Sequence, residues 1–181
     1  MGLHIIIALL HDRPGVLHRT VSLLRRRDYN ILSLSVGRSE TAGISRMTIT
    51  VDVENATQIV RQLDRLVEVI GVADATTLPS IQRETALIKI RTDPEAVMTL
   101  LDLTRSSGGR VLDDGPEDVI IEITDAPEQV EQFVNAIRRF GIAELLCTGR
   151  FAMMRGRSPQ ALEVPTDYRA QADGAPNQEA A

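Results

Sequence analysis

Three histidines near the start of the sequence, His4, His11 and His18, stand seven residues apart, and imidazole groups can serve as metal ligands or general bases. The apolar pattern places His4 in a strand and His18 in a helix, so this spacing does not bring the rings together. No second cysteine or carboxylate pair accompanies them at a spacing typical of metal sites. The sequence therefore predicts no metal site at the histidines.

Acidic residues and the single cysteine are the other groups that could carry chemistry. Asp113, Asp114, Glu117 and Asp118 surround a Gly-Pro pair, which is typical of a solvated hairpin turn. Cys147 follows two leucines in a predicted strand and has no neighbouring base, so we expect a small buried side chain. We predict no catalytic residue in this chain.

The most informative residues lie where the first predicted strand meets the first predicted helix, in the sequence D-R-P-G. Asp12 can accept hydrogen bonds from free N–H groups at the helix start, and Pro14 is tolerated there because its N–H would be orphaned anyway. Gly15 lets a ligand or another chain approach the backbone closely. Such a turn presents donors at the positive end of a helix, where the carboxylate of a small ligand can bind. A plain capping turn would have the same pattern.

The elements around this turn follow from the period of the apolar residues. A continuous apolar run is typical of a central strand, alternation indicates a strand with one buried face, and apolar residues at helical spacing indicate an amphipathic helix. In chain order we expect strand, helix, strand, strand, helix and strand over residues 3–10, 16–24, 32–36, 47–53, from about 56, and 67–77.

The second half of the chain repeats this order. The corresponding elements are expected over residues 86–90, 94–106, 110–113, 119–124, 130–137 and 142–153. Aligning Pro14 with Pro94 gives an offset of 80 residues, so the chain consists of two copies of one βαββαβ unit. The predicted fold class is α+β, with two tandem ferredoxin-like domains whose antiparallel sheets carry helices on one face. We place the domains at residues 1–79 and 80–157, and a disordered tail at 158–181 because that segment has few apolar residues.

The two copies differ at the turn itself. Where the first copy has Gly15, the second has Glu95. This replaces the glycine opening by a bulky anion, so the second copy is not expected to bind what the first copy binds.

Composition excludes several functions. The net charge of −5, two Tyr, three Phe and no Trp argue against binding nucleic acid, which needs basic surface or aromatic stacking. The longest apolar run, residues 5–10, is far shorter than the roughly 20 residues that span a bilayer, so no membrane association is expected. A lone cysteine and the lack of a signal-peptide pattern indicate a cytoplasmic protein.

The first half resembles an ACT domain, a βαββαβ module that binds amino acids as a regulatory signal, and D-R-P-G is widely shared in that family. The whole of residues 2–157 is similar to the small regulatory subunit of acetohydroxyacid synthase, also called acetolactate synthase. The resemblance rests on residues 12–15, 27–31, 45–49, 83–84, 86–90, 140–142, 148–150 and 155–156, in that order along the chain.

The resemblance implies a non-catalytic subunit in branched-chain amino acid biosynthesis. Such a subunit binds valine or a related amino acid for feedback control and activates a catalytic large subunit, which uses thiamine diphosphate, magnesium and FAD; this chain needs no cofactor of its own. In related subunits the effector lies between two ACT domains of a homodimer, one supplying the glycine turn and the other the asparagine after the first helix. Carried over, the effector-binding residues are Asp12, Arg13, Pro14, Gly15, Val16, Leu17, Asn30 and Ile31.

One departure and one alternative accompany this interpretation. Several relatives have asparagine where this chain has Asp12, whose charge would repel an effector carboxylate but could receive its ammonium group. The alternative is a stand-alone sensor with tandem ACT-type domains that controls transcription or another enzyme. The absence of a helix-turn-helix pattern or a basic segment argues against that alternative.

Overall fold

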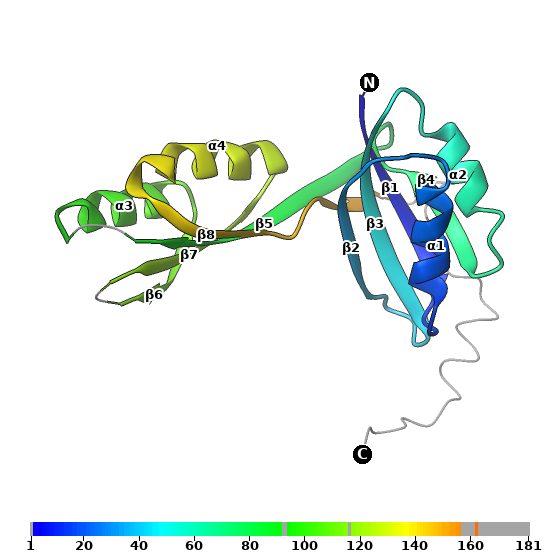
Figure 1. Ribbon diagram of the computed structural model, residues 1–181, viewed down its shortest axis with the longest axis horizontal. Helices are drawn as coiled ribbons and strands as arrows, with labels where there is room; N and C mark the ends of the chain where they lie inside the picture. Colours follow the sequence, from blue (N-terminus) through cyan, green and yellow to red (C-terminus); the bar gives the residue numbers. More distant parts are fainter. Residues whose placement is uncertain (1, 92–93, 116, 157–161, 163–181) are drawn as a thin grey trace, which may run out of the picture. The chain divides into compact units, whose positions relative to one another are not determined.

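The computed structural model describes residues 2–91, 94–115, 117–156 and 162. The chain forms two compact units (Figure 1). Of the described residues, the first unit comprises those up to Ile81 together with those from Ala152 onward, and the second comprises Gln82–Phe151. Among the described residues, no helix combines the length and the hydrophobicity that crossing a bilayer would need.

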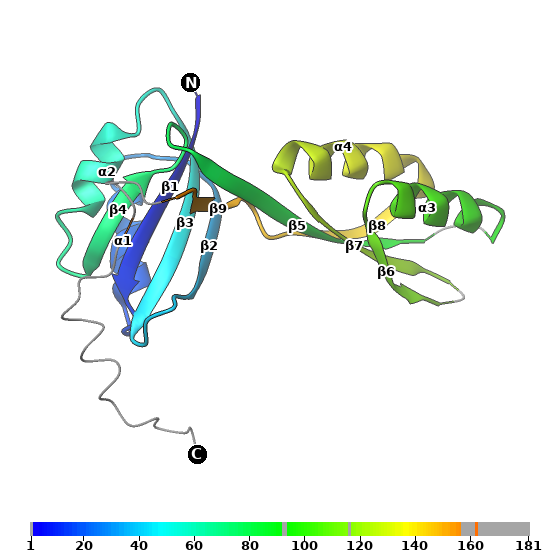
Figure 2. The same cartoon turned by 180° about the vertical axis from the view of Figure 1, so that it is seen from behind.

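The first unit contains one antiparallel sheet with two helices on the same face (Figures 1 and 2). The strand order is β2-β3-β1-β4, so β1, with its continuous apolar run, is central as predicted. In chain order the elements are β1 (Gly2–His11), α1 (Val16–Arg25), β2 (Ile31–Arg38), β3 (Ile44–Val53), α2 (Thr57–Leu63) and β4 (Val69–Asp74).

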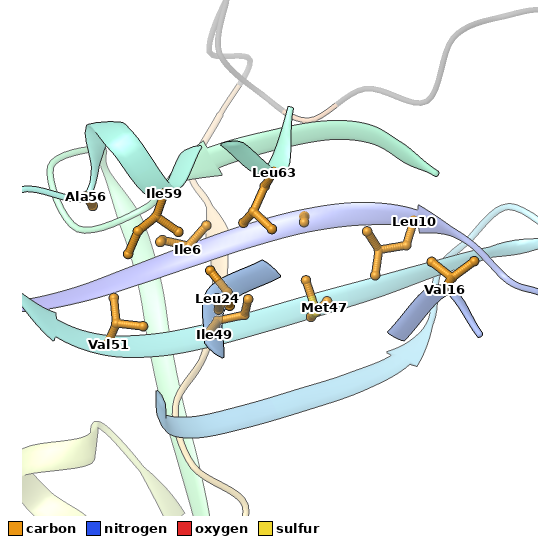
Figure 3. Close-up of a cluster of buried hydrophobic side chains, with 11 residues drawn as sticks. Ile6, Leu10, Val16, Leu24, Met47, Ile49, Val51, Ala56, Ile59 and Leu63 are labelled. Carbon is orange, nitrogen blue, oxygen red and sulfur yellow. The ribbon is translucent and has the colours of Figure 1, made fainter. Parts of the chain in front are cut away.

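The main core of the first unit lies between the sheet and its two helices (Figure 3). Alternate residues of β1 and β3 face the helices, because side chains on a strand alternate between the two faces of the sheet. They pack against apolar residues that recur along α1 and α2. The buried members of this core are Ile6, Ala8, Leu10, Val16, Leu24, Met47, Ile49, Val51, Ala56, Ile59 and Leu63.

The second unit repeats the same plan. Its antiparallel strands have the order β6-β7-β5-β8, and α3 and α4 lie on one face of the sheet (Figure 1). The elements are β5 (Ser80–Ile90), α3 (Pro94–Ser106), β6 (Arg110–Asp114), β7 (Val119–Asp125), α4 (Pro127–Ile137), a 3₁₀ turn (Arg138–Phe140) and β8 (Ile142–Cys147). The predicted α+β class with two ferredoxin-like units is confirmed.

The end of the second unit differs from the sequence prediction. A single strand was expected over residues 142–153, but β8 ends at Cys147 and a separate strand, β9 (Phe151–Met154), follows. Gly149 lies between them with φ 73°, a left-handed conformation that interrupts a strand. From Ala152 onward the chain belongs to the first unit, whereas residues 152–157 had been assigned to the second domain. The predicted disordered tail, 158–181, lies outside the described residues except for Leu162.

Candidate functional site

The turn between β1 and α1 is exposed and is held by backbone hydrogen bonds. The N–H of Asp12 donates to the carbonyl oxygen of Gly43 at 2.8 Å, and the N–H of Arg13 donates to that of His11 at 3.0 Å. Gly15 occupies the position just before the first turn of α1, with φ 84° and ψ −11°. This left-handed conformation favours glycine, which explains the glycine at this position.

The start of α1 has no side-chain cap among the described residues. Asp12 was expected to accept hydrogen bonds there, and this expectation is wrong, because Gly15 and not Asp12 occupies the capping position. The first N–H groups of an α-helix have no acceptor within the helix and carry its positive partial charge. The N–H of Val16 donates to the carbonyl oxygen of Arg13 at 3.3 Å, so the donors that the turn can offer a ligand are the next N–H groups of α1. The Asp12 carboxylate has no capping role there.

Arg19 adds a positive charge beside Gly15, a feature that the sequence analysis missed. A Cβ atom built on Gly15 would lie 3.2 Å from Nη1 of Arg19, so the guanidinium group lies next to the glycine. The Nε of Arg19 also forms a 2.6 Å ion pair with Oε1 of Glu68. Arg19 follows Gly15 by four residues, a spacing that brings residues together along a helix, so the sequence contained a signal for this neighbour.

The structure brings most of the predicted turn residues together but not all of their side chains. Asp12, Arg13, Pro14, Gly15 and Leu17 are exposed at this end of α1. The side chain of Val16, in contrast, belongs to the main core, so only its backbone lies at the turn.

Asn30 and Ile31 lie at the opposite end of α1, where β2 begins. The ten residues of α1 span about 15 Å, which is more than a single small amino acid can bridge. Asp28, with φ 56°, turns the chain out of the helix, and Asn30 is exposed. Within one chain, the two groups of predicted site residues are therefore separate (Figure 1).

Strand β2, which follows Asn30, is an edge strand of the first sheet. It is bonded to β3 on one side only in the sheet order of the described residues. Leu32 and Val36 are 51% and 42% exposed, and β2 contains neither Pro nor Lys, which commonly block pairing at a sheet edge. The edge beside Asn30 is thus suited to pairing with another strand.

The other candidate groups do not form a reactive site in the described part of the chain. No three histidine, cysteine or carboxylate side chains there gather closely enough to hold a metal ion. His4 pairs its Nδ1 with Oδ2 of Asp74 at 3.0 Å. Cys147 was expected to be buried, but it is exposed because β8 is an edge strand. Partial burial, with a further contribution from Glu84, raises the pKa of the Cys147 thiol, which disfavours the nucleophilic thiolate.

Comparison with known proteins places this geometry in a family. The sequence model described as "Small subunit of acetolactate synthase" matches residues 83–156, and that described as "AHAS small subunit-like ACT domain" matches residues 6–71. The probable acetolactate synthase small subunit of Archaeoglobus fulgidus is 39% identical over 155 residues, covering 84% of this chain and 97% of that protein. This chain belongs to the acetolactate synthase small-subunit family.

Further relatives agree with this assignment. The acetolactate synthase small subunit of Bacillus subtilis is 33% identical over 160 residues, covering 87% of this chain and 93% of that protein. The crystal structure of the small subunit from Thermotoga maritima superimposes with a TM-score of 0.80 at 37% identity, covering 87% of this chain and 100% of that chain.

Membership in the acetolactate synthase small-subunit family defines the role of the chain. It is the regulatory subunit of a branched-chain amino acid biosynthetic enzyme whose catalytic part is the large subunit. The family fits a chain without a cofactor of its own.

Proposed function

We propose that this subunit binds valine, or a related branched-chain amino acid, at a site shared between two copies of the first unit. The observation that carries the proposal is the exposed turn at Gly15, where the start of α1 lacks a side-chain cap among the described residues. A helix start with free N–H groups favours a carboxylate, the group that all amino acid effectors share.

The residues around the turn suit the other parts of an amino acid. The Asp12 carboxylate can receive the ammonium group, since its backbone N–H, and not its side chain, holds the turn through Gly43. Nη1 of Arg19, which lies beside Gly15, can donate to the effector carboxylate while Nε is paired with Glu68. Leu17, which is 41% exposed, offers an apolar surface for a branched side chain.

A homodimer formed along β2 would unite the separated halves of the site. Pairing two β2 edges about a two-fold axis places the start of β2 in one copy near the helix start of the other, in two equivalent sites. Asn30 and Ile31 would then complete the site that Asp12–Gly15 of the partner begins. The apolar exposed residues Leu32 and Val36 support this edge as the contact.

The second unit is proposed to contact the catalytic large subunit, for which the family resemblance implies thiamine diphosphate, magnesium and FAD. Leu87 and Leu146, paired across β5 and β8, lie on the sheet face opposite the core and are 38% and 55% exposed. An apolar face of this kind suits a protein partner. We propose that the assembly works in the cytoplasm.

Calorimetric titration of the full chain with valine, leucine and isoleucine tests the effector proposal. Saturable binding of at least one of the three, with one ligand per chain, is expected from two equivalent sites in a dimer. The effector proposal would be overturned if none of the three amino acids showed saturable binding.

A further inference from the structure

Along the central strand β1, the face of the first sheet that carries neither helix, here called the helix-free face, is buried. Ile5, Ile7 and Leu9 of β1 point to this face, because the intervening residues of β1 point into the main core. Their exposed fractions are no more than 1%. In a two-layer unit this face would be solvated, so some other part of the chain covers it.

The cover consists of residues from the C-terminal end of the described chain. Ala152 and Met154 of β9 pack with Ile5, Ile7 and Ala75. In Figure 2, which shows this side of the sheet, β9 lies in front of β1 and β3.

Two hydrogen bonds anchor this cover. Nη2 of Arg46 donates to the carbonyl oxygen of Ala152 at 3.0 Å, and the N–H of Arg155 donates to that of Pro79 at 2.8 Å. Burial lowers the pKa of the Arg46 guanidinium, against the raising effect of Glu40, so the bond to Ala152 compensates a desolvated cation.

Leu162 extends the cover toward the effector turn. It packs in a cluster with Leu9, Ile44 and Ile70. A Cβ on Gly71 would lie 3.0 Å from Cδ2 of Leu162, so the leucine packs closely against the backbone of Gly71.

This cluster lies directly behind the residues that hold the turn. Leu9 lies near the end of β1, three residues before Asp12 in the turn, and Ile44 follows Gly43, whose carbonyl accepts the Asp12 N–H. The two backbone segments that this hydrogen bond joins are therefore continuous with Leu9 and Ile44, which belong to the same cluster as Leu162.

We propose that Ala152, Met154 and Leu162 are a functional part of the effector unit: they close its helix-free face, and Leu162 supports the Asp12–Gly15 turn from behind. The second unit is then an insertion between residues 81 and 152 of the effector unit. Leu162 is a positioning residue, and its expected influence on affinity rests on the proposed effector function.

The test uses full-length variants and a matched control. Met154→Asp and Leu162→Asp place a charge against the helix-free face, whereas Met153→Asp places the same charge on the opposite side of β9, where Met153 is 66% exposed. Hydrogen exchange should rise over Ile5–Gly15 in the first two variants and stay at the wild-type level in Met153→Asp. Valine affinity should fall roughly 3- to 10-fold in Leu162→Asp, a size typical of substitutions that act through packed neighbours.

The two proposals fail in distinguishable ways. If exchange over Leu9–Gly15 in Leu162→Asp equals that in Met153→Asp, the cover does not support the turn and this proposal is overturned. In a chain that binds valine, wild-type affinity in Leu162→Asp would overturn it as well. If the wild-type chain binds none of the three amino acids, the effector proposal fails, and the exchange comparison still decides the present one.

Discussion

The backbone N–H of Asp12 donates a 2.8 Å hydrogen bond to the carbonyl oxygen of Gly43. A main-chain hydrogen bond therefore holds the turn at the start of α1 to the loop before β3. Because the Asp12 side chain has no part in this bond, it can be changed without removing the anchor. The carboxylate is thus open to a test of its role in ligand binding.

Asp12→Asn should weaken valine binding by roughly tenfold, because it removes the negative charge that would receive the ammonium group. Calorimetric titration measures the change, and thermal unfolding checks that the turn is retained. Tighter binding in Asp12→Asn would contradict this orientation, since it would place the ligand carboxylate beside residue 12.

Gly15→Asp should weaken valine binding by roughly 10- to 100-fold, as expected when a like charge is placed within a few Å of the carboxylate. The substitution also imposes a left-handed residue, at about 1–2 kcal/mol, so two controls are needed. Gly15→Asn has the same shape without the charge, and Asn tolerates this conformation. Gly108→Asp imposes the same charge at φ 76° in the second unit.

The pattern among these three variants decides the assignment. Gly108→Asp should bind valine as the wild type does, and Gly15→Asn should lose less affinity than Gly15→Asp. Equal affinity in Gly15→Asp and the wild type would remove the turn from the ligand site.

Leu32→Lys should dissociate the dimer, because lysine on a sheet edge opposes strand pairing. Leu146→Lys, a similarly exposed leucine of the second unit, is the matched variant. Sedimentation should find monomer for Leu32→Lys and dimer for Leu146→Lys. A dimer formed by Leu32→Lys would argue against the β2 edge as the dimer contact.

The same Leu146→Lys variant tests the contact with the catalytic subunit, whose activation should be lost. Full activation by Leu146→Lys would argue against the apolar sheet face of the second unit as that contact.

Glu84→Gln should change the pH dependence of stability. Burial raises the pKa of the Glu84 carboxyl; Arg150 opposes this, and Glu131 and Glu128 add to it. Because its pKa is raised in the folded state, the Glu84 carboxyl favours folding while it is protonated. This contribution to the free energy of unfolding is complete below the unfolded pKa near 4.5 and is lost as pH rises through the folded pKa. Glu84→Gln should therefore gain stability relative to the wild type between acidic and neutral pH.

Thermal unfolding across this range measures the effect, with Glu144→Gln, at an exposed site on β8, as the control. A stability difference between Glu84→Gln and the wild type that does not vary with pH would contradict the assignment.

Much of the fold could be predicted because the apolar period is clear in each unit. The predicted limits of α3, 94–106, match the structure, since Pro94 begins the helix and residues 108–109 are a Gly-Gly pair just after it. The break between β8 and β9 was missed because it depends on the left-handed Gly149 within an otherwise strand-like run. Local pattern also says nothing about which sheet a short strand covers, so the return of residues 152–154 to the first unit was not foreseen.

The sequence predicted which residues form the candidate site but not how these residues are arranged. The D-R-P-G pattern located the turn, yet the capping role expected of Asp12 was wrong, and Arg19 was not noticed. Similarly, Cys147 was expected to be buried because its neighbours are apolar, but its position on an edge strand exposes it. The error at Cys147 depends on a sheet arrangement that sequence spacing does not specify, whereas the error at Asp12 depends on the local backbone, in which Gly15 begins the helix.

The central claim is a valine site completed by two chains, and valine titration of a mixed dimer tests it most directly. Gly15→Asp and Asn30→Ala chains, carrying different affinity tags, are co-expressed, and the mixed dimer is isolated. A shared site places both substitutions in one site and leaves the other site unaltered, so the mixed dimer should bind about one valine per dimer with wild-type affinity. Each parent dimer should bind weakly. A mixed dimer without a wild-type site would contradict the account, because it would show that each chain binds its effector alone.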